Sequence, residues 1–154
     1  MRAGDRNTDH CVITFRAVNA PGAPGYDPGL QRHHLLPRQL LSNRCFGTMF
    51  DRIGRGRIGF DDFRANGMLL PATEQATLRT GMPLHRGPHY RYNAVVIARV
   101  GRIEESWSQA WCRDPESALT EALMRLRLLQ NALRRQLLAE RRRGLLNRND
   151  PPRS

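Results

Sequence analysis

The chain has 154 residues, of which 25 are basic and 14 are acidic, so its formal net charge at pH 7 is +11. All the basic residues are arginine, whose planar guanidinium pairs with phosphate oxygens two at a time, which favours a polyphosphate partner such as nucleic acid. A genome rich in G and C would explain the absence of lysine, but not the excess of basic over acidic residues. No apolar run approaches the roughly 18 residues that a membrane-spanning helix needs, so no membrane partner is expected.

The cysteines and the N-terminus bear on the compartment. Cys11, Cys45 and Cys112 are far apart in the sequence, and none forms a C-x-x-C pair. This odd, unpaired set argues against a zinc ribbon and against a disulfide framework, so we expect reduced thiols, some of them buried. The polar N-terminus lacks the apolar core of a secretory signal. The expected location is the cytoplasm, or export by a dedicated secretion machine without a cleavable signal.

The first two thirds of the chain predict short elements. Residues 1–29 are expected to be a leader, with one β-like run over Cys11–Phe15 and then a surface loop rich in proline and glycine. Short apolar runs, short helices and glycine breaks then alternate over residues 30–107. The short helices are expected around Phe46–Arg52, Asp61–Arg64 and Ala72–Arg79.

Two long helices are predicted after them. Pro88 opens the first, because proline is tolerated at the first helical position, and helical apolar spacing continues to about Cys112. Asp114 as the cap and Pro115 at the first position begin the second helix. Its apolar residues keep a spacing of three and four to about Arg143.

The histidines give the main indication of chemistry. Four of the five form two groups, the adjacent pair His33 and His34 and the pair His85 and His89. Spacing alone fits two unrelated groups equally well, one in a loop and one at a helix start. Imidazole can act as a base near neutral pH and can bind a borderline divalent metal. Neighbours on a strand point to opposite sides, so one histidine of the pair can face a metal and the other a substrate.

Three motifs follow one another along the chain: H-H-L-L-P from His33, N-G-x-L-L-P from Asn66, and H-R-G-x-H-x-x-Y-N from His85. Together they resemble the AHH nuclease family of the HNH/endonuclease VII superfamily, over roughly residues 29–107. Arg32 stands where the family's name has alanine. The resemblance implies a ββα-metal fold, in which a β-hairpin and a helix clamp one divalent ion.

The resemblance also implies roles for these residues. His33 and His85 would bind the metal, with His89 as a third ligand or a phosphate contact. His34 would be the general base that activates water. Asn66 would hold the hairpin loop and orient that base through a hydrogen bond. The cofactor would be one divalent ion, with Zn, Mg, Mn and Ni not distinguished.

Several arginines are weaker candidates for binding substrate. Arg86 and Arg91 flank the second histidine group and are predicted to contact the scissile phosphate, with solvated surface arginines as an equal alternative. The arginines at 134–135 and 141–143 indicate either a basic stripe along the last helix or its ordinary solvated face.

The sequence therefore predicts a helix-rich α+β protein, a ββα-metal (HNH-like) core with long C-terminal helices. The expected parts are a leader (1–29), a nuclease domain (30–112), and a long basic amphipathic helix with a loose tail (113–154). The predicted function is metal-dependent endonucleolytic hydrolysis of nucleic acid, with DNA favoured over RNA. A toxin role with an immunity-type protein partner is left open. The alternative is a non-catalytic protein that binds nucleic acid or a protein partner, with a closed structural metal site of four protein ligands.

Overall fold

A two-stranded sheet and a set of helices make up the computed structural model, which describes residues 11–85 and 89–140. In chain order the elements are η1 (Phe15–Ala17, a 3₁₀ helix), β1 (Leu30–His34), α1 (Gln39–Ser42), α2 (Arg44–Ile53), α3 (Arg55–Ile58), α4 (Phe63–Asn66), β2 (Gly67–Pro71), α5 (Glu74–Thr80), α6 (Tyr90–Trp111) and α7 (Pro115–Ala139). The predicted helix-rich α+β class is confirmed.

Strands β1 and β2 form an antiparallel hairpin in which His33 pairs with Met68 and His34 with Gly67. The connection between them is long, because it contains helices α1 to α4. Gly67 is required where α4 meets β2, since a Cβ there would lie 2.2 Å from a ring carbon of Phe63. The hairpin therefore depends on contacts at its base and not on a tight turn.

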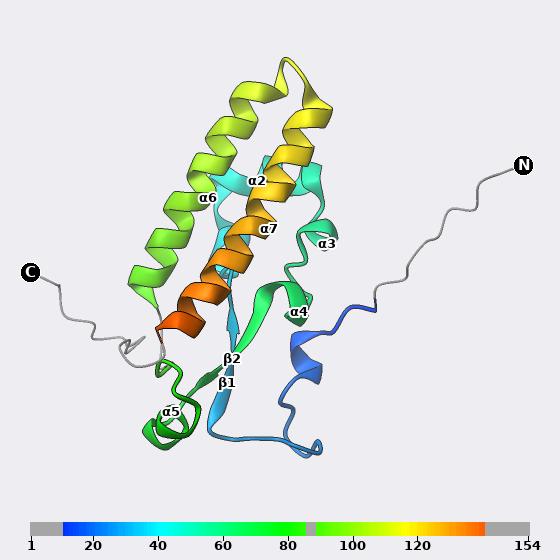
Figure 1. The fold of residues 1–154 in the computed structure, drawn as a ribbon. Coiled ribbons are helices and arrows are strands. Elements are labelled where there is room, and N and C mark those ends of the chain that lie inside the picture. Colours follow the sequence, from blue (N-terminus) through cyan, green and yellow to red (C-terminus); the bar gives the residue numbers. More distant parts are fainter. Residues whose placement is uncertain (1–10, 86–88, 141–154) are drawn as a thin grey trace, which may run out of the picture.

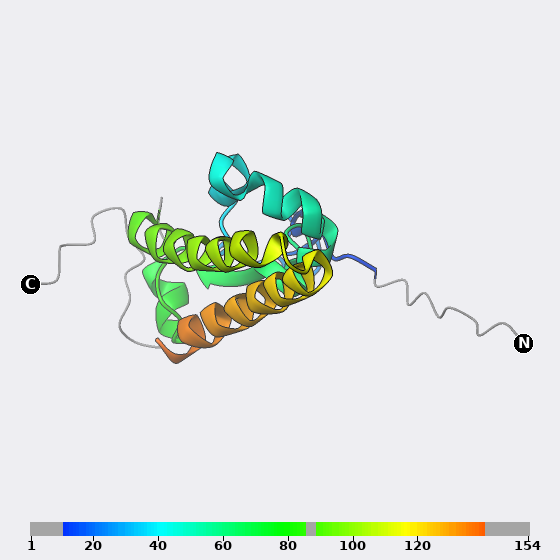
Figure 2. The same ribbon diagram turned by 90° about the horizontal axis from the view of Figure 1, so that it is seen from above.

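Helices α6 and α7 lie side by side and antiparallel, and the β-hairpin lies near the ends of these helices that are away from their connection (Figures 1 and 2). The start of α7 follows the sequence prediction, with Pro115 in the first turn and the Asp114 side chain accepting a hydrogen bond from the Ser117 N–H. The core lies between this helical pair, α2 and the hairpin. Its members include Leu35, Leu36, Met49, Phe50, Phe60, Leu70, Val96, Val100, Ile103, Leu126 and Leu133.

Some local predictions were wrong. The run Cys11–Phe15 is not a strand, because only Thr14 makes a bridge, to Asp62, and the chain then turns into η1. Helix α7 ends at Ala139, four residues earlier than expected. All three cysteines are exposed, where we expected some to be buried. Within the described residues, no helix is long and apolar enough to cross a membrane.

Candidate active site

The two adjacent histidines occupy opposite faces of β1, because successive side chains of a strand alternate. His33 is almost fully buried, with 4% of its surface exposed, whereas His34 is half-buried. The ring of His33 packs edge-on against Tyr92, at 4.9 Å between ring centroids. Tyr92 also donates a hydrogen bond to the Leu35 carbonyl oxygen, at 2.8 Å, and so attaches the first turn of α6 to the end of β1.

His85 and His89 approach His33 from the segment that leads into α6. The backbone N–H of His85 donates to the Pro71 carbonyl oxygen at 2.6 Å, which attaches this segment to the end of β2. His89 is the N-cap residue of α6, and its side chain makes no capping hydrogen bond. Both histidines therefore precede the helix, which begins at Tyr90. Pro88, the predicted start of this helix, lies outside the described residues.

One ring nitrogen from each of His33, His85 and His89 lies within 4.8 Å of the other two. His85 Nε2 is 3.0 Å from His33 Nδ1 and 2.7 Å from His89 Nε2. In a tetrahedral site with metal–nitrogen bonds of about 2.1 Å, the ligand nitrogens are about 3.4 Å apart. Shifts of well under 1 Å along these two contacts would therefore accommodate an ion, and three imidazole donors suit a borderline divalent metal.

Gln31 fixes the orientation of one of these rings. Its Oε1 atom lies 3.1 Å from His85 Nδ1. An amide oxygen only accepts, so Nδ1 carries the proton and the lone pair of Nε2 points into the cluster. Gln31 was not among the predicted site residues, although its position two residues before His33 places it on the same face of β1.

The electrostatics keep all three rings neutral. Burial is the largest cause that lowers the pKa of His33, followed by the neighbouring imidazoles of His85 and His89. Burial and then His89 lower the pKa of His85 to about 4, and burial lowers that of His89. Neutral imidazoles offer lone pairs to a cation at physiological pH. The donor set and its charge state therefore fit a divalent ion.

His34 faces away from this cluster and stacks on Phe15. The two ring centroids are 3.8 Å apart and the planes differ by 5°. Arg32 holds the segment in place by donating from Nη1 to the Phe15 carbonyl oxygen at 2.8 Å. Phe63 packs edge-on against Phe15 on another side, at 5.2 Å. Phe15 was not among the predicted site residues, because residues 1–29 were expected to be a leader.

Burial and nearby charges favour the neutral form of His34. Burial is the largest cause that lowers its pKa, and the nearby guanidinium groups of Arg38 and Arg32 act in the same direction against the carboxylate of Asp61. A neutral ring nitrogen is able to accept a proton from water.

Asn66 is completely buried at the base of the hairpin. Its side chain accepts from the Leu36 N–H at 2.7 Å and donates back to the Leu36 carbonyl oxygen at 3.1 Å. It also donates to the Phe60 carbonyl oxygen and accepts from Gln130. We expected a hydrogen bond from Asn66 to His34, but within the described residues its bonds go to these other groups. Asn66 holds the two ends of the long connection together.

Two arginines, Arg86 and Arg91, are the candidates for contacting the substrate. Arg91 lies on the exposed side of the first turn of α6, two residues after His89. Arg86 lies outside the described residues.

Comparison with known proteins identifies the family. The model of the AHH family, described as a nuclease family of the HNH/ENDO VII superfamily with conserved AHH, matches residues 14–133. The match begins one residue before Phe15 and includes all four histidines of the site. No curated protein and no solved structure shows significant similarity to the chain. Since the family model covers most of the sequence, the chain belongs to the AHH nuclease family of the HNH/ENDO VII superfamily.

Proposed function

We propose that the protein is an endonuclease that hydrolyses phosphodiester bonds of DNA with one divalent metal ion. The observation that carries the proposal is the convergence of ring nitrogens from His33, His85 and His89 at the β-hairpin, in a chain of a nuclease family. The net charge of +11 supports a polyanionic substrate.

In this proposal His33, His85 and His89 hold the ion. When bound there, a divalent cation supplies positive charge that stabilises the negative charge developing on the phosphate. His34 accepts the proton of a water molecule, whose oxygen forms the new bond to phosphorus while the bond to the leaving oxygen breaks. The lone pair of an imidazole lies in the plane of the ring, so stacking on Phe15 engages the face of His34 and leaves the ring edge accessible.

The number of ligands favours catalysis over the alternative of a structural metal. Structural zinc sites are closed by four protein ligands, whereas catalytic sites keep a position open for water or substrate. Among the described residues the cluster contains three histidines. An all-imidazole donor set also favours Zn or Ni over Mg, which prefers oxygen ligands.

The remaining assignments follow from position. Arg91 lies near the metal cluster on the exposed side of α6 and is proposed to contact a substrate phosphate. Arg86 keeps the same proposed role from its place between the two histidines. Asn66 is proposed to support catalysis by holding β1 and β2 in register.

A plasmid-cleavage assay tests the function directly. Wild-type protein with Zn or Ni is expected to nick supercoiled plasmid, and to do so at lower metal concentrations than with Mg. Excess EDTA is expected to stop the reaction. His33→Ala should be inactive with every metal. Cleavage that continues unchanged in EDTA, or that survives in His33→Ala, would contradict the proposal. A toxin role would further predict that expression of the wild-type chain, but not of His34→Ala, arrests growth of the host cell.

A further inference from the structure

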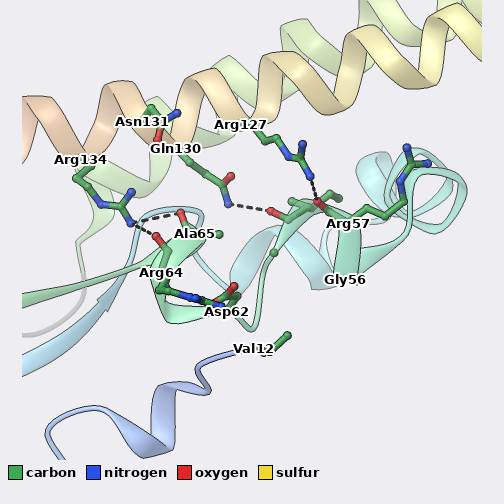
Figure 3. Close-up of a pocket in the computed structure, with 12 residues that line it drawn as sticks. Val12, Gly56, Arg57, Asp62, Arg64, Ala65, Arg127, Gln130, Asn131 and Arg134 are labelled. Atoms are coloured by element: carbon green, nitrogen blue, oxygen red, sulfur yellow. Dashed lines mark hydrogen bonds and ion pairs between the residues drawn. The ribbon is translucent and has the colours of Figure 1, made fainter. Parts of the chain in front are cut away.

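A basic pocket of about 460 Å³ lies between α7 and the α3–α4 segment, outside the histidine site (Figure 3). We call it the arginine pocket, because four guanidinium-bearing residues line it. Arg127 and Arg134 come from α7, and Arg57 and Arg64 come from the opposite wall. The pocket was not expected from the sequence, apart from the proposed basic stripe on the last helix that includes Arg134.

The arginine pocket has a large excess of positive charge. Asp62 is the one acidic residue in its lining, and its nearest arginine contact is with Arg64, at 3.6 Å between Oδ1 and Nε. Within the described part of the chain, no carboxylate pairs with Arg57, Arg127 or Arg134. Guanidinium groups gathered without counter-charges repel one another, so an anion in the pocket would be bound favourably.

Two of these arginines are held in place by backbone carbonyl groups. Arg134 donates from Nη2 to the carbonyl oxygens of Arg64 at 2.7 Å and Gly67 at 3.1 Å, and Arg127 donates from Nη2 to that of Arg57 at 3.2 Å. A guanidinium has five N–H donors, so these bonds leave other donors of each group available. Side chains that are already held lose little entropy when they bind a ligand.

The arginine pocket is close to the face of β1 that carries His34. Val12 lines the pocket, and three residues further along the chain Phe15 stacks on His34. Thr14, which lies between Val12 and Phe15 in the sequence, forms a β-bridge with Asp62, another residue that lines the pocket. A nucleic-acid strand whose scissile bond lies at His34 could therefore continue across the segment from Val12 to Phe15 into the arginine pocket.

We propose that the arginine pocket binds backbone phosphates of the nucleic-acid substrate beside the bond that is cleaved. This inference rests on the proposed function, and it adds a second binding site to the histidine centre. The simpler explanation is that Arg127 and Arg134 only satisfy carbonyl groups at the ends of α3 and α4. If the arginine pocket binds phosphates, replacing its arginines with neutral residues weakens binding of DNA. If the arginines are only structural, the same replacements leave binding of DNA unchanged.

The test measures binding of a short fluorescent duplex in EDTA, so that no cleavage occurs, across a range of salt concentrations. The variants are Arg57→Gln and Arg127→Gln, singly and together, because Arg134 holds several carbonyl groups and its loss could unfold the chain. Arg102→Gln and Arg113→Gln, singly and together, are the matched controls, since they remove the same number of charges from exposed positions outside the arginine pocket, in α6 and in the α6–α7 connection. We expect the double variant to bind on the order of tenfold more weakly than the double control, from the loss of charge-assisted hydrogen bonds. The log–log salt slope should become shallower by about 0.9 for each lost phosphate contact.

The outcomes separate this inference from the proposed function. If the Arg57 and Arg127 double variant matches the Arg102 and Arg113 double control in affinity and in salt slope, the pocket does not bind the substrate. Metal-dependent plasmid cleavage by the wild type would then leave the nuclease proposal intact. If the wild-type protein does not bind the duplex at all at low salt, both proposals fail. Inorganic phosphate at matched ionic strength is the second probe. Should it stabilise the wild type against thermal unfolding while duplex binding ignores Arg57 and Arg127, the pocket is a site for a free anion and the proposal is wrong.

Discussion

The imidazole of His34 lies flat on the phenyl ring of Phe15, with 3.8 Å between the ring centroids and 5° between the planes. Phe15 belongs to η1, a segment 15 residues before β1 begins. Within the described residues, His34 stacks on no other aromatic ring, and no hydrogen bond fixes its imidazole. The orientation of the proposed base therefore depends on a residue far from the histidine motifs in the sequence.

Replacing Phe15 with alanine is expected to lower the cleavage rate by roughly 10- to 100-fold, because the unsupported imidazole would leave the productive geometry. The metal affinity should not change, since the ligands lie on the other face of β1. Phe15→Tyr retains a ring of the same shape and should restore most of the rate. Single-turnover cleavage and calorimetric metal titration check both effects. Full activity in Phe15→Ala would show that the stack does not position the base.

His34→Ala should lower cleavage by about 10²- to 10⁴-fold, the usual contribution of a general base. Metal affinity should stay within about twofold of the wild-type value, because the ring points away from the cluster. Plasmid cleavage and isothermal titration with Ni or Zn measure the two properties in parallel. A variant that still cuts, or one that no longer binds metal, would remove His34 from the role of base.

Saturating metal should raise the melting temperature of the wild type. An ion that binds only the folded state at a hundredfold excess over its Kd adds about 2.7 kcal/mol, which corresponds to roughly 5–10 °C for a chain of this size. His33→Ala and His85→Ala should each abolish this rise, and the double variant should lose no more than either one. His89→Ala should reduce the rise in melting temperature only partly if His89 also contacts phosphate. An unshifted wild-type melting curve would contradict the site.

The sequence predicted the parts of this protein whose signals are local. The α7 start follows from Asp114 and Pro115, and the strand alternation places His33 and His34 on opposite faces of β1. The grouping of His33 with the second histidine pair came from motif order, since spacing alone left it undecided. The contacts of Phe15 and Gln130 could not be predicted, because they join segments far apart in the chain. Gln130 even lies among the apolar positions of α7, where its burial has no local explanation.

Asn66→Ala is expected to act mainly on stability. It would leave the buried N–H and carbonyl groups of Leu36 without partners, at a cost on the order of 2–4 kcal/mol. The melting temperature should fall by roughly 5–15 °C. Asn93→Ala is the control, because Asn93 makes a more exposed hydrogen bond, to Gln39. If Asn66→Ala melts like Asn93→Ala but has lost cleavage, Asn66 acts directly in the chemistry.

The Asp114 cap predicts a dependence of stability on pH. Hydrogen bonds from Ser117 lower the pKa of this carboxyl in the folded state. The contribution of the ionised Asp114 side chain to the stability of the fold is therefore fully present above its unfolded pKa of about 3.9. This contribution is lost as the pH falls through the lower pKa of the folded state. Asp114→Asn keeps the capping oxygen but does not titrate. The difference in melting temperature between wild type and variant should be constant from pH 7 to pH 5 and should shift against the wild type at lower pH. A difference independent of pH would contradict the cap's titration.

The positions of His33 and His34 in the hairpin do not depend on the length of the connection between β1 and β2. Its two ends meet where Leu35 donates to the Asn66 carbonyl oxygen and where the Asn66 amide pairs with the backbone of Leu36. Closing a flexible loop costs only about 0.6 kcal/mol more for each doubling of its length. Segments of different size could therefore be inserted here while His33 and His34 keep their register. In this chain the inserted helices α3 and α4 supply one wall of the arginine pocket, so variation in this connection would change which stretch of nucleic acid is held while the bond-cleaving groups remain the same.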